Sequence, residues 1–206
     1  MTRAQAFSAA VGGVLAHVTA ASNAQSIAAG GLKSAADLAR DAGVPSEHLL
    51  LRRKRLGVGQ ARLNHQRPIA QALRAAERML EGHSPQSWAA QLDRRIFFWP
   101  RDAGKRFAAS ISRDTEITIL WLDAQGLAER YADYIDLSPL NSGNFTQGGA
   151  HAQRGDWLYR PLSEGLAAFR THRRARGLVQ GRDTIREVSL RCPLPAHDLT
   201  ALRVTP

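Results

Sequence analysis

Apolar residues recur along this chain with two different periods, which predicts short strands mixed with short helices. The clearest strand is 117–123, Ile-Thr-Ile-Leu-Trp-Leu-Asp, which is rich in β-branched residues and bounded by charge. Residues 14–19 alternate, so Val14, Ala16 and Val18 share one face and His17 and Thr19 the other. Further strands are predicted over 95–99, 185–191 and 201–205.

Helical spacing, serine caps and glycine stops predict the helices between these strands. Helices are expected after Ser22 or Asn23, from Ser34 to Arg40, over 69–80, after Ser84-Pro85, and over 162–176. Residues 51–67 and 138–156 are interpreted as loops because glycine and polar residues interrupt any periodicity there. Mixed short elements without regular βαβ alternation favour an α+β fold, and no linker or repeat divides residues 1–206, which predicts a single domain.

The charge of the chain indicates a polyanionic partner. Its formal net charge is +10 over 206 residues, and nearly all the positive charge is arginine. Such an excess favours nucleic acid as the partner. Codon bias in a GC-rich genome also enriches arginine and alanine, and this reading stays open beside the first.

The cysteine count and the hydropathy of the chain indicate in which compartment the protein is expected. Cys192 is the one cysteine, so no internal disulfide can form, which favours a reducing, cytoplasmic compartment. No zinc or iron–sulfur spacing exists, so no metal is expected. No run reaches the roughly 18 apolar residues that a membrane helix needs. Residues 1–21 vaguely resemble a signal peptide, but we interpret them as part of the folded domain.

Two residues on predicted strands could carry chemistry. His17 shares a strand face with Thr19, and Glu187 shares one with Ser189 while Val188 and its even-numbered neighbours pack in the core. If the two strands were neighbours, an acid and a histidine would line one cleft. Taken alone, a strand histidine is more often structural, and a single glutamate is usually an edge charge.

An ordered set of motifs resembles the DarT-type ADP-ribosyltransferases, toxins that modify DNA bases. The set comprises His17-Val-Thr19 with Asn23, Ser26-Ile27 and Gly31-Leu32; the run Ile96-Phe-Phe-Trp-Pro-Arg101; and Glu187-Val-Ser-Leu-Arg-Cys-Pro-Leu-Pro195. An uncharacterised bacterial family with the same framework also has segments like Asn141-Ser142-Gly143 and Arg154-Gly155. Asn64 and His65 depart from the pattern, since the DarT-type proteins usually carry an Arg-Asp pair there.

The resemblance implies a compact fold with a split central antiparallel or mixed sheet flanked by short helices, and a site for NAD as co-substrate. It implies that His17 binds the ribose beside the nicotinamide and that Thr19 and Asn23 help to seat the dinucleotide. An arginine of the run 52–55 would meet the pyrophosphate, with Arg53 and Arg55 as the expected residues. Glu187 would be the catalytic residue that stabilises the oxocarbenium-like charge, and His17 would support it.

The function expected from the resemblance is NAD-dependent mono-ADP-ribosylation of DNA or RNA. A toxin or phage-defence role and an antitoxin partner are part of the same expectation. The basic residues Arg101, Arg173, Arg174 and Arg176 are expected to bind the nucleic acid. Two alternatives stay open: an RNA 2′-phosphotransferase-like enzyme, which would not need Glu187, and an inactive nucleic-acid-binding module on the same scaffold.

Overall fold

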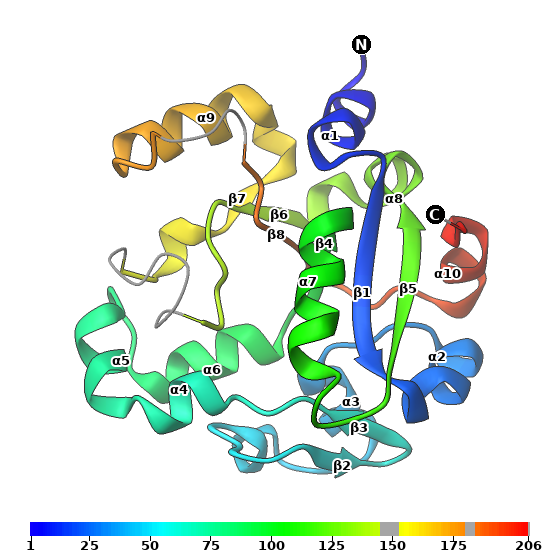
Figure 1. Cartoon of the computed structure of the whole chain (residues 1–206), viewed down its shortest axis with the longest axis vertical. Helices are drawn as coiled ribbons and strands as arrows, with labels where there is room; N and C mark the ends of the chain where they lie inside the picture. The colour runs from blue at the N-terminus through cyan, green and yellow to red at the C-terminus, as the bar shows by residue number, and fades with distance from the viewer. Residues whose placement is uncertain (145–152, 180–183, 206) are drawn as a thin grey trace.

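A six-stranded antiparallel sheet forms the centre of the structure (Figure 1). The computed structural model describes residues 1–144, 153–179 and 184–205, without the side chains of residues 76 and 77. About half of the chain is helix and a fifth is strand, so the α+β class is confirmed. The sheet has the order β5-β1-β4-β8-β6-β7, and a separate hairpin pairs β2 with β3. The strands are β1 (Val14–Ala20), β2 (Leu56–Val58), β3 (Ala61–Leu63), β4 (Ile96–Pro100), β5 (Ile117–Asp123), β6 (Ile135–Ser138), β7 (Arg160–Pro161) and β8 (Glu187–Leu190).

The sheet opens between β1 and β4. Strand β1 pairs with β5 along its whole length, from Val14 opposite Asp123 to Ala20 opposite Ile117. On its other edge, β1 pairs with β4 only at Leu15 opposite Pro100 and Ala16 opposite Trp99. Beyond Ala16 the two strands separate, and this opening lies toward the β2–β3 hairpin (Figure 1).

One face of the sheet carries the main hydrophobic core. Alternate residues such as Leu15, Phe98 and Val188 pack there against helices α1, α8, α9 and α10. Each of these helices contributes fully or nearly fully buried residues, including Phe7 and Phe169. The helices are α1 (Arg3–Val11), α2 (Ala24–Gly30), α3 (Ala35–Asp41), α4 (Arg67–Gln71), α5 (Leu73–Met79), α6 (Pro85–Asp93), α7 (Arg101–Ile111), α8 (Ala124–Tyr131), α9 (Gly165–Ala175) and α10 (Ala196–Leu202).

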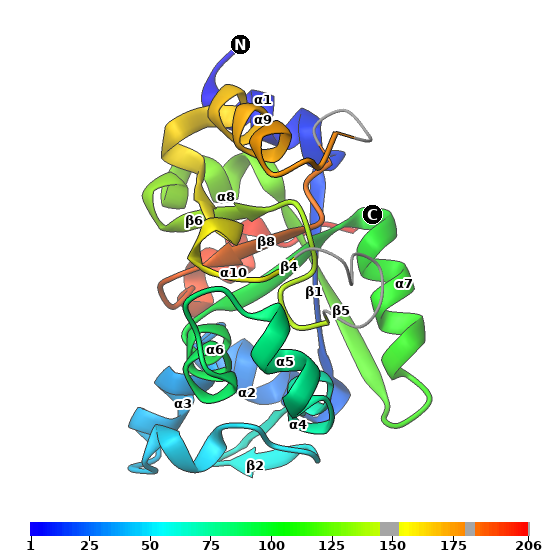
Figure 2. The same ribbon diagram turned by 90° about the vertical axis from the view of Figure 1, so that its left-hand side faces the viewer.

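Two groups of helices cover the opposite face. Helix α7 lies across β1 and β4. It can pack closely against β1 because Gly104 has no side chain: a Cβ at this position would sit 2.3 Å from the Cβ of Ala16. Helices α4, α5 and α6 form a second group (Figure 2). Trp88 of α6 and Leu80 pack there with Leu158 and Tyr159 in a separate hydrophobic cluster. The face of β6 and β8 that carries Glu187 is therefore enclosed by protein.

Several sequence predictions are confirmed. Strand 117–123 is observed with the predicted bounds, and strands 14–19, 95–99 and 185–191 are observed within a few residues. Ser34 and Ser84 cap their helices through hydrogen bonds from the backbone N–H groups of Asp37 and Ser87. Gly31, at a φ of 78°, ends α2.

Other predictions are wrong. No strand forms over 201–205: residues 201 and 202 end α10, whose Leu199 and Leu202 both face the core, and Arg203 makes only an isolated bridge with Leu122. The predicted loop 51–67 contains the β2–β3 hairpin, which turns at Gly59 with a φ of 55°. The predicted helix 69–80 breaks at Ala72, whose φ of −116° is not helical. Helix α7 was not predicted.

Within the described ranges, no helix is both long enough and apolar enough to cross a membrane.

Candidate functional site

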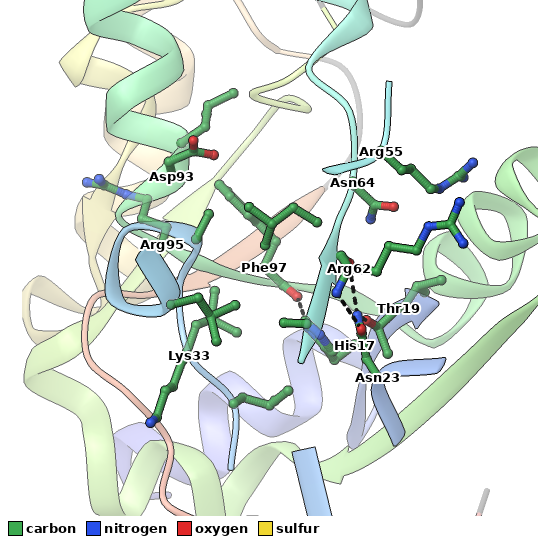
Figure 3. Close-up of a pocket in the computed structure, with 18 of the residues that line it drawn as sticks. His17, Thr19, Asn23, Lys33, Arg55, Arg62, Asn64, Asp93, Arg95 and Phe97 are labelled. Atoms are coloured by element: carbon green, nitrogen blue, oxygen red, sulfur yellow. Dashed lines mark hydrogen bonds between the residues drawn. The ribbon is translucent and has the colours of Figure 1, made fainter. Parts of the chain in front are cut away.

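The sheet opening leads into a cavity of about 660 Å³. The end of β1, the β2–β3 hairpin, α2, α6 and β4 contribute to its walls, together with the segment 141–144 that follows β6. His17, Thr19, Asn23, Arg55 and Glu187 all line it. The structure therefore brings together five of the six residues predicted for catalysis and dinucleotide binding. Figure 3 labels four of them: His17, Thr19, Asn23 and Arg55.

His17 lies where β1 and β4 separate. Its Nδ1 is 2.9 Å from the carbonyl oxygen of Phe97, across the gap between the strands. A carbonyl can only accept a hydrogen bond, so Nδ1 carries the proton and a neutral ring keeps Nε2 as an acceptor. Burial lowers the pKa of His17, which favours this neutral form.

Strand β4 separates the two predicted catalytic residues, since β1 and β8 are not neighbours. The register places Leu15, Phe98 and Val188 on the core face, so alternation assigns His17 to that face and Glu187 to the other. Both side chains nevertheless line one cavity, because the opening beyond Ala16 gives access to both faces.

Asn23 fastens the hairpin to the end of β1. Its Oδ1 accepts from the N–H of Arg62 (2.7 Å), and its Nδ2 donates to the Arg62 carbonyl (3.0 Å) and to the Thr19 hydroxyl (2.9 Å). Both residues are buried, with 6 and 7% of their surfaces exposed. Asn23 thus holds the cavity wall in place with both amide hydrogens engaged, whereas the Thr19 hydroxyl accepts from it and keeps its own O–H as a donor.

The four-residue basic run 52–55 divides into different roles. Arg52 donates to both carboxylate oxygens of Asp93 (2.6 and 2.9 Å) and to two backbone carbonyls, so it is committed to the fold. Arg53 is exposed and does not line the cavity. Arg55 lines it, and its buried Nε has no hydrogen-bond partner among the residues that the structure describes.

A second arginine of the cavity, Arg62, was missed by the sequence analysis. It lies on β3 opposite Gly57, and no side-chain partner is found for it among the described residues. The other cavity cations are neutralised: Lys33 by Asp41, and Arg95 by Asp136. Figure 3 shows Arg55 and Arg62 on the side of the cavity away from Asp93 and Arg95.

Glu187 is a buried carboxylic acid at the start of β8, with 2% of its surface exposed. Its Oε1 accepts from the hydroxyl of Ser142 (2.5 Å) and from the N–H of Ser142 (3.3 Å). Burial raises the pKa of Glu187 to about 7, against the opposing effects of Ser142, Arg154 and Arg95. Such a group changes charge near neutral pH, as is common for catalytic acids and bases.

The segment Asn141–Asn144, here called the strap, is held on the carboxylate by buried groups. The indole N–H of Trp88 donates to the Ser142 carbonyl (3.1 Å), and Nε of Arg154 donates to the Asn141 carbonyl (2.9 Å). Arg154 is fully buried, and burial lowers its pKa to about 10. Two signals in the sequence pointed to this segment: the polar composition of 138–156 and the resemblance of Asn141-Ser142-Gly143 and Arg154-Gly155 to segments of a related family.

The predicted nucleic-acid-binding arginines differ in exposure and in pairing. Arg173 of α9 is buried, whereas Arg174 is exposed. Arg176 donates to the carboxylate of Glu81 (2.9 and 3.2 Å) and covers the ring of Trp157 at 4.5 Å. Arg101 is exposed at the first position of α7. Helix α9 therefore offers far fewer free charges than its sequence predicts.

Among the described residues, no three His, Cys, Asp or Glu side chains are grouped so that they could hold a metal ion. The cavity instead combines the neutral His17, the two arginines without an acidic partner among the described residues and the buried Glu187 with apolar walls such as Ile96.

The model of one protein family, described as "Family of unknown function (DUF7002)", matches residues 13–200. No curated protein and no solved structure matches the chain.

Proposed function

The chain belongs to the DUF7002 family, and we propose that it is a cytoplasmic NAD-dependent mono-ADP-ribosyltransferase whose acceptor is a nucleic acid. Glu187 and His17 line the same cavity, and this pairing is the main support for the proposal. The resemblance of its opening, middle and closing motifs to DarT-type transferases supplies the reaction class.

The residues present in the cavity fit a dinucleotide. Arg55 and Arg62 supply two guanidinium groups for the pyrophosphate, and the unpartnered Nε of Arg55 is a donor that such a ligand would satisfy. Apolar side chains such as Phe97 offer surfaces for the aromatic rings. His17 Nε2, as an acceptor, suits a ribose hydroxyl.

In the proposed reaction, the bond between the ribose carbon and the nicotinamide nitrogen breaks, and its electron pair leaves with nicotinamide. The acceptor atom of the nucleic acid then forms its bond to the same carbon and loses a proton. Glu187, when ionised, stabilises the positive charge that develops on the ribose and receives that proton. The strap fixes the carboxylate so that little reorganisation is needed during the reaction.

Glu187 also argues for this reaction over an RNA 2′-phosphotransfer. The latter relies on arginines and a histidine and has no need for a late-strand glutamate. Here the glutamate is buried, accepts hydrogen bonds from the strap and lines the cavity. Burial of a carboxyl group costs free energy, which an ordinary exposed charge on a strand avoids.

The test is incubation of the purified protein with NAD that carries a label on the adenosine, in the presence of separate pools of DNA, RNA and protein. We expect release of nicotinamide and covalent label in a nucleic-acid pool, both lost in Glu187→Gln. Label in the protein pool alone would overturn the acceptor. If no nicotinamide were released and no pool carried label, the proposed enzymatic activity would be wrong. The inactive nucleic-acid-binding module would then be the remaining alternative.

A further inference from the structure

A second cavity, of about 480 Å³, lies at the C-terminal end of β4, where this strand passes into α7. It is lined by the end of α1, by the first turns of α7 and by residues 184–186, which precede β8. Three arginines contribute to it: Arg101 and Arg106 from α7, and Arg186. We call this space the arginine cavity.

The charges of the arginine cavity are not neutralised by the protein. All three arginines are exposed, and within the described parts of the chain no hydrogen bond or ion pair engages their side chains. Asp102 also lines the cavity, and it too has no ion-pair partner there. Three positive charges thus face one negative charge in a concave surface, an arrangement that attracts an anion.

The arginine cavity lies next to the catalytic carboxylate in the chain but on the other face of the sheet. Arg186 lines it, whereas Glu187 lines the main cavity. The same alternation holds on β4, where Pro100 lines the arginine cavity and Trp99 the main one. β4 ends and β8 begins at this end of the sheet, so the consecutive residues Arg186 and Glu187 line different cavities.

We propose that the arginine cavity holds a backbone phosphate of the nucleic-acid acceptor, and so directs a neighbouring nucleotide toward Glu187. Guanidinium groups match the paired oxygens of a phosphodiester, and a strand with a phosphate at every nucleotide can occupy the cavity and still reach the reacting centre. This inference rests on the proposed function for the nature of the acceptor. It replaces α9 as the docking surface, because Arg173 is buried and Arg176 is paired with Glu81.

The experiment compares two triple variants that remove the same charge. The cavity variant is Arg101→Gln, Arg106→Gln and Arg186→Gln, and the control is Arg94→Gln, Arg113→Gln and Arg203→Gln. The control arginines are exposed and line neither of the two cavities. A double variant, Arg101→Gln with Arg106→Gln, leaves the segment before β8 intact should the triple variant be unstable.

Binding of a short fluorescein-labelled single-stranded DNA, and of RNA of the same sequence, is measured by anisotropy at several salt concentrations. We expect the cavity variant to bind at least tenfold more weakly than the control at low salt. For the cavity variant, the slope of log K against log salt concentration should become shallower by up to about two, since each phosphate contact with a single strand contributes roughly 0.7 to this slope. NAD affinity should not change in either variant.

Equal loss of binding in both triple variants would overturn the proposal, because net charge alone would then explain it. Unchanged binding in the folded cavity or double variant would also overturn it, as would equally tight binding of polyglutamate by the wild-type protein. Failure of the proposed function looks different: the wild-type protein would bind nucleic acid through this cavity but release no nicotinamide.

Discussion

Ser142 donates two hydrogen bonds to the same oxygen of Glu187, one from its hydroxyl at 2.5 Å and one from its N–H at 3.3 Å. Both stabilise the ionised carboxylate, whereas burial favours the protonated form. The balance between them places the pKa of Glu187 at about 7, and several consequences can be measured.

Ser142→Ala should move the pH dependence of transfer to higher pH. The hydroxyl lowers the pKa of Glu187, so its loss raises that pKa further and fewer molecules are ionised at neutral pH. A hydrogen bond to a charged group is worth about 1.5–3 kcal/mol, which corresponds to a midpoint ~1–2 pH units higher. The measurement is the pH profile of kcat/KM for nicotinamide release.

Ser189→Ala is the matched control for this change. Ser189 lies on the same face of β8 as Glu187, and its buried hydroxyl has no hydrogen-bond partner in the described part of the chain. We expect the wild-type profile in this variant. If Ser142→Ala also kept that profile, the strap would not tune Glu187.

Glu187→Gln should slow transfer strongly and raise stability at alkaline pH. Loss of a preorganised charge of this kind typically costs about a hundredfold to a thousandfold in rate. A carboxyl with a folded pKa near 7, above its ordinary 4.5, binds more protons folded than unfolded between these values. Wild-type stability therefore falls as pH rises through this window, by on the order of 3 kcal/mol.

Thermal melts at pH 5 and pH 8 test the stability part of this prediction. The Tm of Glu187→Gln should exceed the Tm of the wild type by more at pH 8 than at pH 5. An equal gap at both values would show that Glu187 does not titrate in this range, and wild-type turnover in the variant would remove Glu187 from catalysis.

His17→Ala should weaken NAD binding more than it lowers Tm. His17 bonds to the Phe97 carbonyl across the sheet opening and keeps Nε2 as an acceptor toward a ligand. Calorimetric titration with a non-hydrolysable NAD analogue measures the affinity. A large drop in Tm with unchanged affinity would make His17 a structural residue.

Arg55→Gln and Arg62→Gln should each weaken binding of NAD and of ADP, with little effect on adenosine. Both arginines line the main cavity without an acidic partner among the described residues, so they are available to a pyrophosphate. We expect a loss of about tenfold each, in keeping with ~1.5 kcal/mol for a charged hydrogen bond. Arg53→Gln is the control, since Arg53 lies in the same run but outside the cavity. Equal losses in Arg53→Gln would argue against a specific site.

Asp93→Ala should destabilise the fold, because it leaves Arg52 buried without its partner. The two side chains are 11 and 8% exposed and form paired hydrogen bonds of 2.6 and 2.9 Å. Breaking such a pair costs about 3–5 kcal/mol of unfolding free energy, measured with urea. Asp41→Ala, which removes the exposed partner of Lys33, should cost less than about 1 kcal/mol. Similar costs for both changes would contradict the structural role of Arg52.

The sequence by itself determined the local features of the protein. Strand 117–123 and the alternation that buries Val188 could be predicted, because side chains on a strand alternate between a core face and the opposite face. The serine caps of α3 and α6 were equally visible, since a cap involves only neighbouring residues. The prediction failed for α10, whose last two residues were assigned to a strand over 201–205 although Leu199 and Leu202 have helical spacing.

Only the tertiary structure decided how these elements make a site. Alternation puts His17 and Glu187 on opposite faces, with β4 between their strands, and they share a cavity because β1 and β4 separate beyond Ala16. Arg52 and Arg55 look equivalent in the sequence, but Asp93, 41 residues after Arg52, neutralises only one of them. Ser142 reaches Glu187 across 45 residues through a strap held by Trp88 and Arg154. These contacts depend on packing between distant segments, and no local pattern of polar and apolar residues specifies them.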